Sequence, residues 1–133
     1  GRGAMMTADM MRIVSRFDPC CIGAIWDAAH SALAGENVEQ AIDLCWSHLC
    51  LANFKNARYQ MYGRDLNGCA VYKAYFCPGQ DGNISWPRAV AHLKKKGYTG
   101  TWCMPAEYTD LSPEEEKQYT IRDLKWLKSL VEG

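Results

Sequence analysis

The feature of this sequence that most constrains its fold is an alternation of short apolar runs with longer segments of helical period. Apolar runs of strand length occupy residues 20–26, 49–54 and 101–104. Apolar residues at helical spacing predict helices over residues 7–15, 38–47, 86–96 and 120–131. This alternation is typical of βα units, in which helices cover a sheet of parallel strands. The sequence therefore predicts an α/β fold.

The segment from residue 56 to residue 85 is longer than a simple connection between a strand and a helix. Loops of such length in compact domains usually carry a function. Residues 71–76 alternate like a strand, which indicates a small hairpin inside the segment. Further along, Ser112 to Glu115 has the pattern of a capping box and predicts a short helix ahead of the last one.

Length and charge exclude several classes of protein. The chain has 133 residues, well below the roughly 250 residues of a closed eight-stranded α/β barrel. Fifteen basic residues balance fifteen acidic ones, so there is no electrostatic footprint of nucleic-acid binding. No apolar stretch approaches the roughly eighteen residues of a membrane span, and no signal-peptide pattern is present. We expect a cytoplasmic protein without nucleic-acid or membrane partners.

The chain reads as a single domain over residues 6–133, preceded by residues 1–5, which resemble a cloning remnant. Its seven cysteines form no C-x-x-C pair, which argues against a disulfide framework or a zinc ribbon. Five of them lie in apolar surroundings, so we expect small buried side chains at Cys20, Cys21, Cys45, Cys50 and Cys103.

Six short motifs occur in a characteristic order along the chain. They are Trp26-Asp27-x-x-His30, Ala34-Gly35-Glu36, Asn53-Phe54-Lys55-Asn56, Gly82-Asn83-Ile84-Ser85-Trp86, Gly97-Tyr98-x-Gly100 and Glu107-Tyr108. In this order and spacing the chain resembles the last three βα units of the sugar-phosphate isomerase/epimerase barrels, the xylose-isomerase-like family. The resemblance implies a partial (β/α)8 TIM barrel, a half-barrel whose parallel strands would be the sixth, seventh and eighth. Most of the polar motif residues fall at or just after the carboxyl end of a predicted strand, where barrel active sites are built.

The resemblance also implies roles for individual residues. Metal ligands would be Asp27, Asn53 and Glu107, and Glu107 would also be the catalytic acid or base. Substrate contacts would come from His30, Lys55 and Asn56. Where the family places a histidine and later an aspartate, this chain has Asn53 and Asn56, and a neutral amide suits Mn²⁺ or Mg²⁺ better than zinc. The glutamate that the family carries on strand four has no counterpart. We therefore expect a divalent metal to be weakly held or absent.

Simpler interpretations remain for the same residues. Asp27 also fits the N-cap of a turn, His30 a structural histidine and Glu107 a surface carboxylate. Three functions follow in order of preference. The first is an isomerase or epimerase of a sugar or sugar phosphate, incomplete alone, acting as a homodimer or with a complementing N-terminal half. The second is a non-enzymatic half-barrel that self-associates. The third, an apurinic endonuclease, is disfavoured because the chain has only three histidines and no net charge.

Overall fold

The computed structural model describes residues 6–133, so the interpretation of residues 1–5 as a remnant lies outside it. The described chain contains five α-helices, one short 3-10 helix and five strands. In order they are α1 (Thr7–Val14), β1 (Ala24–Asp27), α2 (Ala28–Ala34), α3 (Val38–Cys45), η1 (Trp46–His48), β2 (Leu49–Asn53), β3 (Asn56–Arg64), β4 (Ala70–Cys77), α4 (Trp86–Lys95), β5 (Thr101–Cys103) and α5 (Pro113–Glu132).

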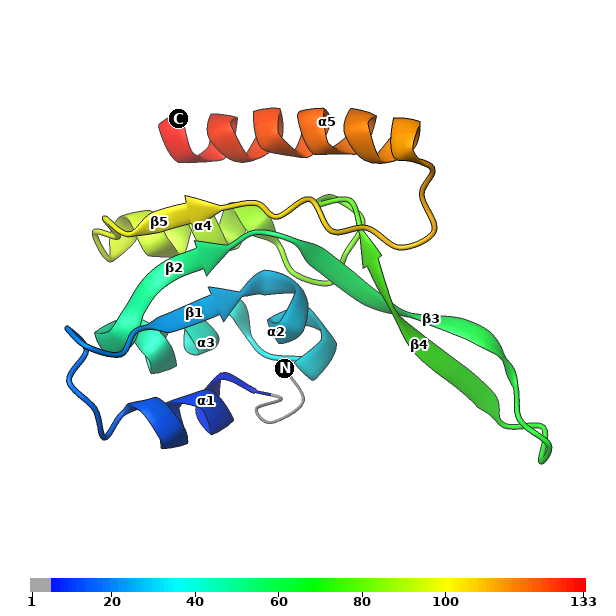
Figure 1. Ribbon diagram of the computed structural model, residues 1–133, viewed down its shortest axis with the longest axis horizontal. Helices are drawn as coiled ribbons and strands as arrows, with labels where there is room; N and C mark the ends of the chain where they lie inside the picture. The colour runs from blue at the N-terminus through cyan, green and yellow to red at the C-terminus, as the bar shows by residue number, and fades with distance from the viewer. Residues whose placement is uncertain (1–5) are drawn as a thin grey trace.

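The strands form two separate sheets (Figure 1). Strands β1, β2 and β5 make a parallel sheet in that order, while β3 and β4 pair antiparallel as a hairpin that projects away from it. Helices α1, α3, α4 and α5 pack side by side in sequence order, and α3 and α4 lie behind the parallel sheet in the view of Figure 1. The α/β class predicted from the alternation is confirmed.

The core lies between the parallel sheet and its helices. Trp26 and Ala52 are in register on adjacent strands and are 1% and 0% exposed, because their side chains point toward the helix layer. Ile42 of α3 and Leu93 of α4 are 0% exposed and belong to the same cluster. Each of these residues lies on the apolar stripe of its helix, which explains why the apolar residues of α3 and α4 recur at helical spacing in the sequence.

Aromatic side chains join the core to the last helix. The Phe54 ring packs against those of Trp26, Trp86 and Trp102 with centroid distances of 5.6–5.8 Å. Trp86 in turn stacks on Trp126 of α5 at 5.1 Å. The 0% exposed Phe54 therefore contacts α4 directly, and Trp86 continues the aromatic contacts to α5.

Side-chain caps define where most helices begin. Ser85 accepts from the backbone N–H of Arg88 at the start of α4, as the sequence predicted. The capping box at Ser112 and Glu115 is also confirmed, but it opens one continuous helix, Pro113–Glu132. The prediction of a separate short helix before residue 120 was wrong, because no glycine or proline interrupts the helical pattern between Glu114 and Val131.

Two other elements near the N-terminus differ from the predictions. Cys20 and Cys21 lie in a turn and Ile22 in a bend, so the first strand does not begin at Cys20 but at Ala24. Helix α2 was not predicted, because its apolar residues are mostly small alanines that give a weak periodic signal. Thr7 does not cap α1 as predicted: its N–H and hydroxyl donate to Glu36, which thereby ties α1 to the turn after α2.

The hairpin predicted around residues 71–76 is confirmed and is longer than expected. Strand β3 contributes nine residues and β4 eight. The turn between them is held by the carboxylate of Asp65, which accepts from the backbone N–H of Asn67 and of Cys69. Gly68 has a φ of 80°, a conformation that glycine adopts at little cost. The sequence Asp-Leu-Asn-Gly thus supplies the turn residues that this hairpin needs.

The cysteine prediction is only partly correct. Cys45 is buried and Cys103 is intermediate, but Cys20, Cys21 and Cys50 are exposed. Burial raises the pKa of the Cys45 thiol to about 12, so this thiol is unreactive at neutral pH. Cys20 and Cys21 are exposed because they lie in the turns that precede β1 and not in the strand.

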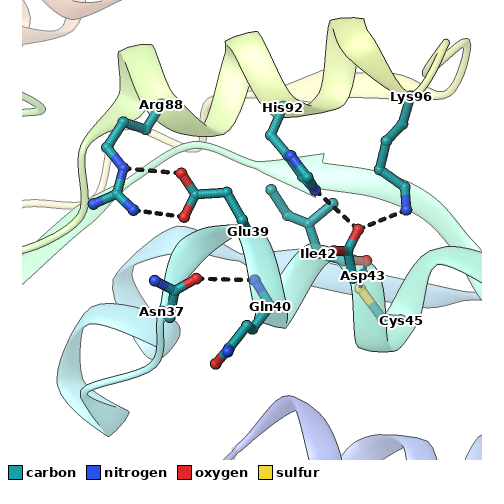
Figure 2. A network of polar contacts seen from close by, with 9 residues as sticks. All are labelled: Asn37, Glu39, Gln40, Ile42, Asp43, Cys45, Arg88, His92 and Lys96. Atoms are coloured by element: carbon teal, nitrogen blue, oxygen red, sulfur yellow. Dashed lines mark hydrogen bonds and ion pairs between the residues drawn. The ribbon is translucent and has the colours of Figure 1, made fainter.

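Ion pairs fasten the outer sides of α3 and α4 (Figure 2). Glu39 receives two hydrogen bonds from the guanidinium of Arg88, at 2.9 and 2.6 Å. Asp43 Oδ1 lies 2.6 Å from Lys96 Nζ and 2.9 Å from His92 Nε2. A hydrogen bond from Arg88 holds the pKa of the Glu39 carboxyl below its usual range, and hydrogen bonds from Lys96 and His92 do the same for Asp43. The two helices therefore meet through an apolar inner contact and a charged outer one. No helix within residues 6–133 is both long and apolar enough to cross a membrane.

Candidate functional site

Polar side chains gather where the three parallel strands end. Asp27 and Asn53 are the last residues of β1 and β2 and are in register with each other, and Asn53 is in register with Cys103 of β5. Asn53 Nδ2 donates to Asp27 Oδ2 at 2.8 Å. Since parallel strands bring their carboxyl ends to one edge, the motif order in the sequence becomes a spatial cluster.

Lys55 connects the carboxylates of two strands. Its Nζ lies 2.7 Å from Glu107 Oε2 and 3.4 Å from Asp27 Oδ2. Its side chain is only 10% exposed, whereas that of Glu107 is 49% exposed. We define Asp27, Asn53, Lys55 and Glu107 as the strand-end cluster. All four were predicted as site residues, and the structure brings them together.

The backbone directs Glu107 toward this cluster. Residues 104–108 follow β5 without regular structure, and Ala106 has a φ of 51°, in the left-handed region that alanine rarely adopts. Such conformations persist only where the surroundings enforce them, and they concentrate at functional sites. After this residue, the chain places Glu107 beside Lys55.

His30 lies beside the cluster on α2. Its backbone N–H donates to Asp27 Oδ1 at 3.1 Å, so Asp27 is the N-cap of α2 as well as a partner of Lys55. The imidazole ring meets the ring of Phe76 edge to face, with a centroid distance of 6.3 Å. Phe76 also lies under Lys55, whose Nζ is 5.0 Å from the ring centroid. His30 and Lys55 therefore flank one aromatic ring at the base of the hairpin.

Asn56, predicted to contact substrate, is placed differently. It is 0% exposed, and its Nδ2 donates to the carbonyls of Gly79 and Ile84 at 2.8 and 2.7 Å. Its Oδ1 accepts from the backbone N–H of Ala57 and of Ile84. The amide is thus fully used inside the protein, where it fixes the connection from the hairpin to α4.

A buried carboxylate on α5, Asp123, supports the segment that carries Glu107. Asp123 of α5 is 2% exposed, and its Oδ2 accepts from the N–H of Gly79 at 2.7 Å and from the Tyr108 hydroxyl at 3.1 Å. Burial and the charge of Asp123 raise the pKa of Tyr108 well above its usual range, so the phenol stays protonated as a donor. Asp123 Oδ1 has no hydrogen-bond partner in the described part of the chain, although Arg122 Nε lies 3.5 Å from it. Since Tyr108 follows Glu107 directly, these bonds fix the segment that carries Glu107.

The strand-end cluster does not fit a divalent metal as arranged. The ammonium of Lys55 lies between the two carboxylates that would coordinate the ion. Both oxygens of Asp27 already accept hydrogen bonds, from His30 N–H and from Asn53 Nδ2. Within residues 6–133 no group of three or more His, Cys, Asp or Glu side chains is placed to hold a metal ion. We therefore derive no chemical step through a metal.

Comparison with known proteins adds no family: no model of a protein family matches this chain, and neither does any curated protein. The candidate site rests on its own geometry. That geometry includes Phe76, which the sequence reasoning missed. Its alternation within residues 71–76 predicted a strand, but nothing in the pattern indicated that the hairpin base would return to the end of β2.

Proposed function

We propose that this chain binds a sugar or sugar phosphate at the strand-end cluster, as part of an isomerase or epimerase type of site built on a partial (β/α)8 barrel. The observation that carries the proposal is the convergence of Asp27, Asn53, Lys55 and Glu107 from the ends of three parallel strands. These residues are separated by up to 80 positions in the sequence, yet they share one edge of the sheet.

The chemistry of the cluster suits hydroxyl groups. Two carboxylates accept hydrogen bonds from sugar hydroxyls, while the Lys55 ammonium and the Asn53 amide also donate. The half-exposed Glu107 is the group that can reach a bound ligand most readily. Phe76 and His30 offer a partly apolar surface beside these polar groups, against which the C–H face of a sugar ring can pack.

The same geometry favours binding over turnover. Isomerisation needs a base that takes a proton from the carbon next to a carbonyl, and Glu107 is the available carboxylate. Its Oε2 already accepts a hydrogen bond from Lys55 at 2.7 Å, so this oxygen is occupied and not free to contact a substrate carbon. Losing one positioned acid or base typically costs about 10²- to 10⁴-fold in rate. We therefore expect the 133-residue chain alone to bind sugars without isomerising them at an enzymatic rate.

Saturation-transfer NMR with a panel of pentoses, hexoses, ketoses and their phosphates tests the proposal. We expect transfer to at least one class of sugar, and we expect Glu107→Gln to weaken it. Lys95→Gln is the matched control, because Lys95 lies on the exposed side of α4. Chromatography of the same mixtures should show no conversion. Turnover above roughly 1 s⁻¹ that disappears in Glu107→Gln would contradict the expected lack of activity, and no transfer from any sugar would overturn the proposed binding.

A second candidate function is self-association without catalysis. Within residues 6–133, strands β1 and β5 each have one edge that pairs with no other strand. On the sheet face away from α3 and α4, Ile25 is 51% exposed. Unpaired edges and exposed apolar side chains are relieved when two sheets associate, so we propose a homodimer as the preferred form.

Light scattering coupled to gel filtration tests the homodimer. We expect a mass near twice 15.0 kDa at micromolar concentration. Ile25→Ser should shift the species toward the monomer, whereas Ile13→Ser, at an exposed position on α1, should not. A stable monomer for the unmodified chain would exclude this candidate.

A further inference from the structure

Lys55 lies at the centre of the strand-end cluster. Its Nζ is 2.7 Å from Glu107 Oε2 and 3.4 Å from Asp27 Oδ2, and its side chain is 10% exposed. The Phe76 ring lies 5.0 Å away and adds a favourable contact with the cation. The Lys55 ammonium is therefore largely buried and is contacted by two carboxylates and one aromatic ring.

A divalent ion cannot share this position. To coordinate both carboxylates it must lie about 2.0–2.6 Å from their oxygens, which brings it within a few ångströms of Lys55 Nζ. Repulsion between the ion and the ammonium is then strong, because little water separates them. Asp27 would also have to give up the hydrogen bonds that it accepts from His30 and Asn53.

We propose that the Lys55 ammonium is the resident cation of the strand-end cluster, so that the site takes an uncharged polyhydroxy ligand without any divalent metal. This inference rests on the proposed sugar binding for its ligand, but its statement about the cation is tested separately. The two carboxylates and the ammonium carry a net charge of −1. An uncharged sugar or polyol therefore fits the cluster better than a sugar phosphate, whose negative charge the carboxylates repel.

Titration with Mn²⁺, followed through the electron paramagnetic resonance signal of the free ion, tests the cation. We expect no saturable binding by the unmodified chain. Lys55→Gln removes the ammonium and leaves the carboxylates, so it should bind Mn²⁺ at least about tenfold more tightly than the upper limit that the titration sets for the unmodified chain. Lys55→Arg keeps the positive charge and should not gain affinity, and neither should Lys95→Gln.

Two results of this titration overturn the inference. One is saturable Mn²⁺ binding by the unmodified chain that is lost in Glu107→Gln. The other is a folded Lys55→Gln variant, checked by circular dichroism, that gains no affinity. If Lys55→Gln does not fold, Lys55→Met takes its place in the titration. Methionine has a similar length and no charge, so this variant should gain Mn²⁺ affinity in the same way.

Binding of a neutral sugar and of its phosphate, measured with and without EDTA, separates this inference from the proposed function. We expect the neutral sugar to bind equally well in EDTA and more tightly than the phosphate. Binding that requires Mn²⁺, or a preference for the phosphate, overturns the inference and leaves sugar binding intact. No binding of either compound in any buffer overturns the proposed function and the ligand class, while a gain of Mn²⁺ affinity in Lys55→Gln still supports the assignment of the cation.

Discussion

The two faces of the parallel sheet have opposite characters. On one face, Trp26 and Ala52 point into a layer of helices and are 1% and 0% exposed. On the other face, the adjacent residue Ile25 is 51% exposed, and Asp27 follows at the strand end. A single strand therefore carries a core residue, a surface residue and a site residue in consecutive positions, because side chains alternate along a strand.

The comparison separates the residues that stabilise the fold from the residues of the candidate site. The helix-covered face holds the aromatic cluster that connects the sheet to α4 and α5. The open face and its carboxyl edge hold the polar cluster around Lys55. Because few of the buried contacts involve the open face, substitutions there should alter binding or association and leave the fold intact.

Trp26→Ala compared with Ile25→Ala is the strongest test of this difference. Removing a fully buried Trp side chain should lower the free energy of unfolding by about 3–5 kcal/mol, because it leaves a cavity against Phe54. Ile25→Ala should cost less than about 1 kcal/mol, because half of that side chain already contacts water. Urea unfolding followed by circular dichroism, at a concentration where the chain is monomeric, measures both. Equal losses would show that the open face is also part of the core.

Gly82→Ala tests the connection between the hairpin and the helix layer. A Cβ at Gly82 would overlap the side-chain amide of Asn56, which is 0% exposed and cannot move without breaking its hydrogen bonds. We expect a loss of about 1–3 kcal/mol in unfolding free energy. The control is Gly63→Ala in the hairpin, where a Cβ meets nothing within 4 Å. A thermal unfolding midpoint that falls as much in the control as in Gly82→Ala would contradict the packing assigned to Asn56.

Asp43→Asn should have the smallest effect, because this carboxylate is on the exposed outer side of α3. Its pKa is lowered by hydrogen bonds from Lys96 and His92, so its contribution to stability is present above its usual pKa and is lost as the pH falls through the lowered value. The variant should be slightly less stable than the unmodified chain at pH 7. Thermal unfolding should show this difference shrinking below about pH 4. If the stability difference between the variant and the unmodified chain grew as the pH fell, it would contradict a lowered pKa for Asp43.

Much of the fold could be predicted from the sequence, because periodicity and caps are local signals. The helices at α3 and α4 and the strands β2 and β5 were placed within one or two residues. The first strand was predicted too early, since apolar Cys20 to Ile22 gave the same signal as a strand although they lie in a turn and a bend. Helix α2 was missed for the converse reason, because alanines carry little periodic contrast.

The site could be predicted only in part, because its contacts are not local. The resemblance to the isomerase/epimerase barrels implied one site that contains Asp27, Asn53, Lys55 and Glu107, together with His30 and Asn56. The sequence did not reveal that Lys55 would lie between the carboxylates, since that depends on the turn at Ala106. Nor did it separate Asn56, which follows Lys55 directly but points into the protein.

A ¹H–¹⁵N NMR titration with a neutral sugar in EDTA tests the central claim most directly. The account predicts that amide shifts change at Asp27, Asn53, Lys55 and Glu107, at the carboxyl edge of the parallel sheet. Amides of α3 and α4, on the covered face, should stay unchanged up to about 50 mM ligand, a concentration that detects even weak sites. Shift changes confined to α3 and α4, or none at the strand-end cluster with any sugar of the panel, would contradict the claim that this edge is a sugar-binding site.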